Sequence, residues 1–236
     1  RDRHRPRALG RDDYFSGRRV LVTAGPTQEP IDPVRYVGNR SSGRMGYAIA
    51  QAAWRRGADV TLVTGPSTLD HPWGVDVVPV ETAQEMFDAV ADLVGSADVA
   101  VFAAAVSDFR PSDVREKKVK RSEEGDTLSV DFQANPDVAR DTRGARKQGS
   151  VTVGFALETH DMLEHAQRKL ESKGFDLLVA NDATEEGAGF GVSTNRVTIL
   201  GVGHDPEVLP LLSKDEVAER LLDRVSGSTA PEAGGS

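Results

Sequence analysis

The feature that most constrains the fold is a regular alternation of short apolar runs with segments of helical periodicity. The runs cover residues 20–22, 59–64, 75–80, 98–106, 151–156 and 176–180. Most end at Gly, Pro or charged residues, which is typical of strands buried in a parallel sheet. Between them apolar residues recur at helical spacing, as in Met45, Ala48, Ile49, Ala52 and Ala53. The alternation predicts an α/β, Rossmann-like protein whose mainly parallel sheet has helices on both faces. Residues 195–201 are expected to add an antiparallel edge strand.

A chain of 236 residues is long enough for one domain with a sizeable core. We expect residues 18–225 to form it. Residues 1–17 lack apolar periodicity and are interpreted as a linker remnant, and residues 226–236 have the composition of a flexible tail. No apolar run reaches about 18 residues, so no membrane span is predicted. The N-terminus also lacks the apolar segment of a secretory signal.

Charge and cysteine content narrow the functions further. The formal net charge of −8 argues against general nucleic-acid binding, so an anionic ligand needs a local site. The chain has no Cys, which excludes disulfides, Cys-based zinc sites and thiol nucleophiles. The same absence fits a reducing compartment, and we expect a cytoplasmic protein.

Residues 110–135 interrupt the alternation with dense charge, including Lys117, Lys118, Lys120 and Arg121. Such density between core strands predicts a solvated excursion, and one this long is often a functional flap. A short strand is expected at 128–132. Ammonium groups on a flap can neutralise a polyphosphate, yet a charge run alone is more often just a solvated loop.

Two segments have the character of an anion cradle, namely TAGPT at 23–27 and NRSSGRMG at 39–46. Small residues let backbone N–H groups approach an oxygen, and the helix N-terminus adds a favourable dipole. Gly25, Ser41, Ser42 and Gly43 are the candidates. The alternative is that Ser41 or Ser42 merely caps the helix.

The segment AAAVSDF at 103–109 follows a central strand, where ligands bind in open α/β sheets. Its Ala residues leave room for a flat ring, and Asp108 is placed to accept from ligand donors or to position a metal. A helix-packing Ala run with a turn Asp is an equal alternative. Lys169 and Lys173 are four residues apart and share a helix face, as solvent-exposed lysines commonly do. The five His show no ligand spacing, so no metal ligands are assigned.

In this order the chain contains VLVTAGPTQEPIDPVRYVGNRSSGRMGYAIA, AAAVSDF, KVKR, NPDV, VGFALET and KGFDLLVAND. Over residues 18–225 this combination resembles the phosphopantothenate–cysteine ligases, the ligase half of bacterial coenzyme A biosynthesis bifunctional proteins. The resemblance implies CTP-dependent joining of 4′-phosphopantothenate to L-cysteine through an acyl-cytidylate, with release of pyrophosphate and then CMP. Such a reaction needs anion sites, cations and a base slot but no nucleophilic side chain, so positioning would dominate catalysis.

The resemblance also implies residue roles. Asn39 would act on the acyl-cytidylate, and Lys118 would be the first Lys of a KxKK flap motif. That motif reads KVKR here, and Arg121 keeps the charge with a different geometry. The implied nucleotide contacts are Phe102, Ala103, Ala104, Asp108, Lys118, Pro136, Asp137, Val138, Ala139, Phe155, Lys169 and Lys173. The implied phosphate cradle is Gly25, Ser41, Ser42 and Gly43.

The same resemblance implies a homodimer whose flap reaches a shared active site, and Mg²⁺ accompanying CTP. It also implies an upstream decarboxylase domain that is absent here, so no flavin is expected on this chain. The residues themselves do not distinguish CTP from ATP. An NAD(P)-dependent oxidoreductase is the main enzymatic alternative, but the sequence has no Tyr-x-x-x-Lys pair and no continuing glycine fingerprint. A non-catalytic nucleotide-binding module is the alternative of a different class.

Overall fold

The computed structural model describes residues 13–120, 125–158, 162–182 and 194–227. In this part of the chain, eight strands form the central sheet in the order β13-β12-β10-β9-β6-β1-β4-β5. Its parallel members are β1 (Arg19–Ala24), β4 (Asp59–Thr64), β5 (Asp76–Pro79), β6 (Val99–Phe102), β9 (Val151–Glu158) and β10 (Leu177–Asp182). The predicted α/β class with a mainly parallel sheet is confirmed.

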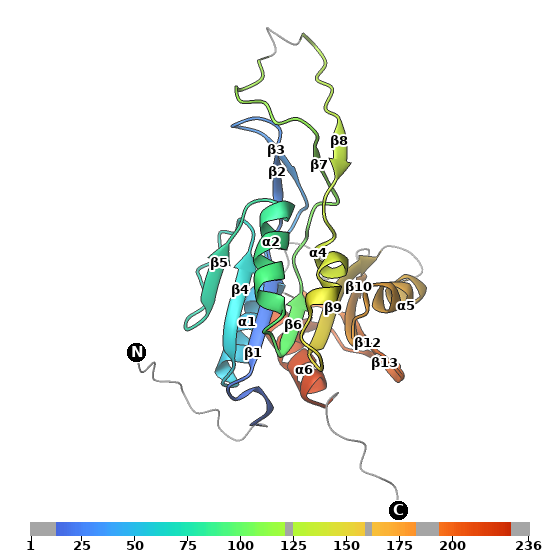
Figure 1. Ribbon diagram of the computed structural model, residues 1–236. Helices are drawn as coiled ribbons and strands as arrows, with labels where there is room; N and C mark the ends of the chain where they lie inside the picture. Colours follow the sequence, from blue (N-terminus) through green and yellow to red (C-terminus); the bar gives the residue numbers. More distant parts are fainter. Residues whose placement is uncertain (1–12, 121–124, 159–161, 183–193, 228–236) are drawn as a thin grey trace, which may run out of the picture.

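Helices cover both faces of this sheet because alternate strand residues are apolar on both sides. Val20 and Val22 of β1 pack in one cluster with α1 (Arg44–Arg55) and α6 (Lys214–Gly227). Leu21 faces the opposite cluster, which includes residues of α2 (Ala83–Val94), α4 (Val138–Asp141) and α5 (Met162–Lys173). Figure 1 shows the two helical layers on either side of the sheet.

Residues 195–201 were expected to form an antiparallel strand at the sheet edge. The strand β12 (Val197–Gly201) is indeed antiparallel to β10, but it is not the edge. The strand β13 (His204–Val208) returns through a turn with Gly203 at φ +74° and pairs outside it. Every residue of β13 is exposed, so its sequence carried no apolar pattern to predict a strand.

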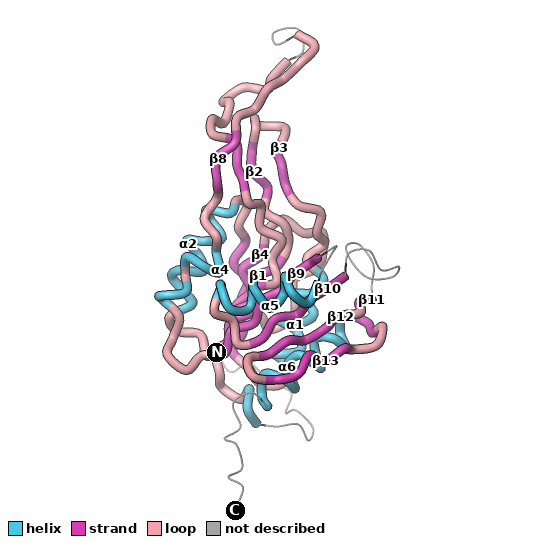
Figure 2. The backbone as a smooth tube through the Cα atoms, turned by 90° about the vertical axis from the view of Figure 1, so that its right-hand side faces the viewer, coloured by secondary structure: helices cyan, strands magenta, loops and turns pink. Residues whose placement is uncertain are grey.

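Two short hairpins extend from the carboxyl edge of the sheet and form a projecting arm (Figures 1 and 2). One pairs β2 (Gln28–Pro30) with β3 (Tyr36–Gly38), and the other pairs β7 (Phe109–Pro111) with β8 (Phe132–Ala134). We call residues 28–38, 109–120 and 125–134 the arm. It contains most of the described part of the predicted flap, although the strand expected at 128–132 lies instead at 132–134 because β7 pairs there.

The ends of the domain are held by particular contacts. Within the expected linker, Asp13–Phe15 forms a short 3₁₀ helix and Phe15 is fully buried, so packing begins before residue 18. Residues 1–12 and 228–236 lie outside the described part.

On the α1/α6 face, the buried guanidinium of Arg56 donates to Glu219 and Asp223, in each case at 2.7 Å. These charge-assisted bonds fasten α6 to the end of α1.

Candidate functional site

The carboxyl ends of the central strands open into a cavity of about 790 Å³ at the base of the arm. Its lining comes from the carboxyl-terminal parts of β1 and β9, from the loop after β6, from the segment preceding α1, and from α4 and α5. The volume is that of a typical small-molecule site, and the position is where doubly wound sheets bind ligands.

Most residues singled out from the sequence meet at this cavity. Those lining it are Asn39, Ser41, Ser42, Gly43, Phe102, Ala103, Ala104, Asp108, Pro136, Asp137, Val138, Ala139, Phe155, Lys169 and Lys173. The structure does not bring Gly25 or Lys118 to its lining. Lys118 is exposed on the arm beside the buried Val119, and Arg121 lies outside the described residues.

Gly25 lies behind the cradle and has a packing role. It adopts φ +75°, and a Cβ on it would come within 3.0 Å of the Gly65 carbonyl oxygen. Gly43 adopts φ +76°, and a Cβ there would lie 3.2 Å from Gly25 Cα. Backbone therefore packs on backbone, which fixes where the segment before α1 crosses the end of β1.

The helix α1 begins at the cavity with an uncapped N-terminus. Gly43 is its N-cap residue and makes no side-chain capping bond. Ser41 Oγ instead accepts from the Gly43 N–H at 3.3 Å, one residue before the helix begins. The alternative that Ser41 or Ser42 caps α1 is therefore wrong. The first N–H groups of α1, with its dipole, are placed for an anion in the cavity.

Hydroxyl groups join the end of β1 and the loop after it to the loop after β6. Thr23 Oγ1 accepts from the Ala104 N–H at 3.2 Å, and buried Thr27 Oγ1 accepts from the Ser107 N–H at 2.9 Å. The Asn39 amide spans the same loops, because its Nδ2 donates to the Val106 carbonyl at 2.9 Å. Asn39 is thereby held at the cavity rim beside the strand-end backbone.

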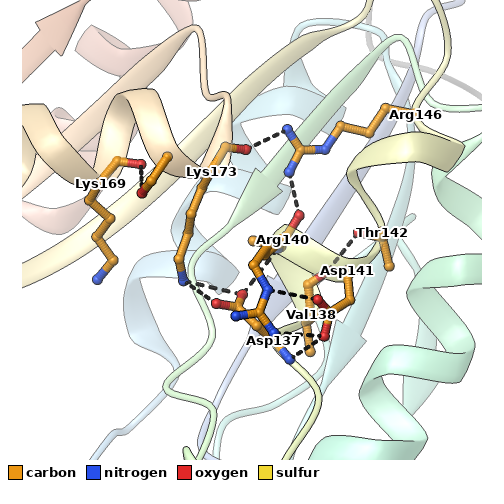
Figure 3. Close-up of polar contacts among 10 residues, drawn as sticks. Asp137, Val138, Arg140, Asp141, Thr142, Arg146, Lys169 and Lys173 are labelled. Atoms are coloured by element: carbon orange, nitrogen blue, oxygen red, sulfur yellow. Dashed lines mark hydrogen bonds and ion pairs between the residues drawn. The ribbon is translucent and has the colours of Figure 1, made fainter.

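An ion pair forms the opposite wall. Lys173 of α5 points at Asp137, and its Nζ lies 3.0 Å from Oδ2 (Figure 3). Asp137 also caps α4 by accepting from the Arg140 N–H at 3.0 Å. Burial alone would raise the pKa of Asp137, but the bonds from Arg140 and Lys173 outweigh it and lower that pKa. Asp137 is therefore an ionised carboxylate that orients the lysine.

Arg146 is a positioning residue that sequence reasoning missed. Its guanidinium donates to the carbonyls of Ala139 at 2.5 Å and Gly174 at 2.9 Å. It also donates to the Lys173 carbonyl at 3.2 Å, so it links α4 to the end of α5 (Figure 3). It also stacks near Phe102 and Phe175, at 5.2 and 5.4 Å from the ring centroids. In the sequence, Arg146 lies in the polar segment TRGARKQG, where an arginine is expected to be exposed. The sequence alone therefore did not indicate that Arg146 positions α4 and α5.

The described residues offer little to a bare metal ion. Among them no group of three or more His, Asp or Glu side chains is placed to hold one. Asp108 and Asp137 are the carboxylates of the described cavity lining, and Asp137 is engaged by Lys173. Such a lining fits a Mg²⁺ ion that arrives on phosphate groups and keeps much of its water. No described helix combines the length and apolar character needed to cross a membrane.

The doubly wound sheet and its strand-end cavity define an α/β protein with a cavity of the size of a small-molecule site. The chain belongs to the family described as "DNA/pantothenate metabolism flavoprotein C-terminal domain", whose model matches residues 15–228.

Known proteins make this placement more specific. The chain is 44% identical over 206 residues to the "Coenzyme A biosynthesis bifunctional protein CoaBC" of Vibrio vulnificus, covering 87% of this chain and 51% of the relative. It is 46% identical over 221 residues to the protein of the same name from Mycobacterium bovis, covering 89% and 52%. The chain thus spans about half the length of these curated relatives.

A solved structure agrees with these relatives. The crystal structure of the C-terminal domain of CoaBC superposes with a TM-score of 0.77 at 38% identity, covering 92% of this chain and 97% of that one. The similarity to the C-terminal half of these bifunctional proteins, indicated by the sequence motifs, is confirmed.

Proposed function

We propose that this chain is a phosphopantothenate–cysteine ligase that uses CTP and acts in the cytoplasm. The observation that carries the proposal is the convergence, at one strand-end cavity, of most of the motifs shared with that ligase family, KVKR excepted. In the first step a carboxylate oxygen of 4′-phosphopantothenate attacks the α-phosphorus of CTP and pyrophosphate leaves. In the second, the cysteine amine attacks the acyl carbon, loses a proton, and CMP leaves as 4′-phosphopantothenoylcysteine forms.

The residues of the cavity supply positioning and charge for both steps. Asn39, held by the Val106 carbonyl, would orient the acyl group. The Lys173–Asp137 pair and Phe155 would hold the nucleotide, and the N-terminus of α1 would receive phosphate oxygens. Asp108, an exposed carboxylate of the cavity lining, would help to hold Mg²⁺ brought in with CTP, and the ion would supply neutralisation of phosphate charge. The thiol in this chemistry would be the substrate's, since the chain has no Cys.

We further propose a homodimer in which the arm contacts a second subunit and completes its site. The arm exposes large apolar side chains that nothing in the described part of the monomer covers: Val34, Tyr36, Val37, Phe109, Val114, Leu128 and Phe132. Exposed large apolar side chains that gather on one projecting element favour a protein partner. In the dimer, Lys118 would reach the partner's cavity rather than its own. The flavin-dependent decarboxylase that the motif resemblance implies would be a separate domain.

Pyrophosphate release tests the assignment directly. With 4′-phosphopantothenate, L-cysteine, CTP and Mg²⁺, we expect release that depends on the acid substrate, and faster release with CTP than with ATP. A rate unchanged when phosphopantothenate is omitted would contradict the ligase. Pyridine-nucleotide oxidation with no pyrophosphate would favour an oxidoreductase, and CTP binding without turnover a non-catalytic module.

Replacing Asn39 by Ala tests the second half of the reaction. We expect Asn39→Ala to activate the acid but to stall before amide formation, so that mass spectrometry of the quenched mixture detects accumulated acyl-cytidylate. Normal product formation with no intermediate would remove Asn39 from the mechanism.

Lys118→Gln tests the arm. Because Lys118 would face the departing pyrophosphate, we expect its loss to lower turnover more than CTP affinity. A change confined to affinity would instead indicate simple ground-state binding.

A further inference from the structure

The cavity has a second cationic wall that the residues assigned so far do not use. Asp137, Lys169 and Lys173 come from the side of the sheet covered by α4 and α5. Arg44, Met45, Asn195 and Lys214 line the same cavity from the other side, where α1 and α6 pack.

Two helices start at this wall. Arg44 is the first residue of α1 and Lys214 is the first residue of α6. Since both residues line the cavity, the positive ends of two helices of 12 and 14 residues lie at its wall. The acidic residues of the first turn of α6, Asp215 and Glu216, line a separate shallow pocket instead.

The position of Lys214 is set by the fold. The short strand β14 (Leu212–Ser213) leads directly into α6 and pairs with β11 (Thr194–Asn195), whose Asn195 is buried. The Ser213 hydroxyl then caps α6 by accepting from the Glu216 N–H at 3.2 Å. Lys214 is therefore anchored on both sides and is half-buried at the cavity.

The electrostatics of this wall favour an anion. Burial, and then the nearby charge of Arg44, lower the pKa of Lys214. Arg44 and Lys214 are two neighbouring cations at the wall, and a bound oxyanion with charge of about −2 would be attracted by both side chains and by the helix N-termini. A phosphate group at neutral pH carries about this charge.

We propose that Lys214 and Arg44 form a phosphate-binding wall of the cavity, in which Lys214 contacts a substrate phosphoryl group that also meets the N-terminus of α1. The identity of that substrate rests on the proposed function. The two sources are the terminal phosphates of CTP, retained as pyrophosphate after activation, and the 4′-phosphate of phosphopantothenate. Both present the same chemistry to the wall.

The test compares dissociation constants, by calorimetry, of Lys214→Gln and the unmodified protein. The probes are inorganic pyrophosphate, CTP, phosphopantothenate and cytidine. Losing a charge-assisted hydrogen bond should weaken at least one phosphate-bearing probe about 10-fold or more, with cytidine unchanged. If Lys214→Gln weakens the binding of pyrophosphate and CTP, the group bound at the wall is a phosphate of the nucleotide. If it weakens the binding of phosphopantothenate alone, the group is the 4′-phosphate. Lys214→Arg should restore most of the affinity.

Matched controls keep the test decisive. Arg220→Gln removes the same charge from an exposed position on α6 and should change none of these constants more than twofold. Arg44→Gln should reproduce the Lys214→Gln pattern, and it replaces that variant if Lys214→Gln does not fold. Dissociation constants within twofold of the unmodified protein for every phosphate probe would overturn the proposal. Pyrophosphate binding needs no turnover, so an inactive protein with Lys214-dependent binding would refute the ligase and leave the wall intact.

Discussion

The carboxylate of Asp32 accepts a hydrogen bond from the backbone N–H of Val119 at 3.1 Å, although 87 positions of sequence separate them. Asp32 lies in the turn between β2 and β3 and is almost fully buried. It also accepts from the N–H groups of Val34 and Arg35, each at 2.8 Å. Arg35 completes the contact by donating to the Val119 carbonyl at 2.5 Å. One turn of the arm therefore clamps the centre of the KVKR segment.

We predict that Asp32→Ala releases this segment without unfolding the domain. Trypsin should cut after Lys117, Lys118 or Lys120 about 10-fold faster, because the hydrogen bonds that close the segment are lost. Mass spectrometry of the early fragments locates the cuts. Asp113→Ala removes an exposed carboxylate from the same excursion and should leave the cleavage rate unchanged. Equal rates for both variants would show that Asp32 does not hold the segment.

We predict that Arg146→Met destabilises the domain by about 1–3 kcal/mol, because partly buried carbonyls of Ala139 and Gly174 lose their donor. Urea unfolding followed by circular dichroism measures this change. Arg143→Met is the matched control, since Arg143 is exposed and lies one turn earlier. An effect no larger than that of the control would reduce Arg146 to a surface cation.

We predict that Lys173→Gln weakens CTP binding about 10-fold, since the ammonium held by Asp137 faces the proposed nucleotide. Calorimetric titration gives the dissociation constant. Arg168→Gln removes a cation from the exposed side of the same helix and should bind CTP as before. Unchanged affinity in Lys173→Gln would leave the Lys173–Asp137 pair with a structural role alone.

We predict that the Lys173–Asp137 pair makes stability fall in acid. The pKa of Asp137 is lowered in the folded protein from its ordinary value of 3.8, so folding favours the ionised form. Its contribution is complete above the unfolded value of 3.8 and is lost as pH falls from there through the lower folded value. We expect the free energy of unfolding, measured with urea, to fall less between pH 6 and pH 3 in Asp137→Asn than in the unmodified protein. The loop variant Asp70→Asn should follow the unmodified protein, and equal losses in all three would refute the prediction.

Much of the fold was predictable from sequence, for a physical reason. Strands buried on both faces must be apolar throughout, so runs such as 20–22 and 98–106 identified the sheet. Parallel strands place their carboxyl ends at one edge, and that rule puts AAAVSDF at the cavity. NPDV and the segment before α1 reach the same cavity because α4 and α1 begin there.

The features that were missed have weak local signals. The strand β13 is exposed and polar, and the arm hairpins are three residues a strand. Arg146 and Lys214 resemble surface cations in sequence and gain their positions only through tertiary packing. Lys118 is the opposite case, because its motif indicated a site residue, whereas the structure places it exposed on the arm and outside the cavity lining of the same chain.

The bonds from Arg56 to Glu219 and Asp223 have a mechanical consequence. They tie α6 to the C-terminal end of α1, while Arg44 and Lys214 stand at the other ends of the same two helices. The two helices are therefore joined at Glu219 and Asp223 and both begin at the cavity, while the last turn of α6, up to Gly227, lies beyond the join. Any shift of the wall on binding would be transmitted along the length of α6, so a spectroscopic label at that distant end would report occupancy without touching the ligand.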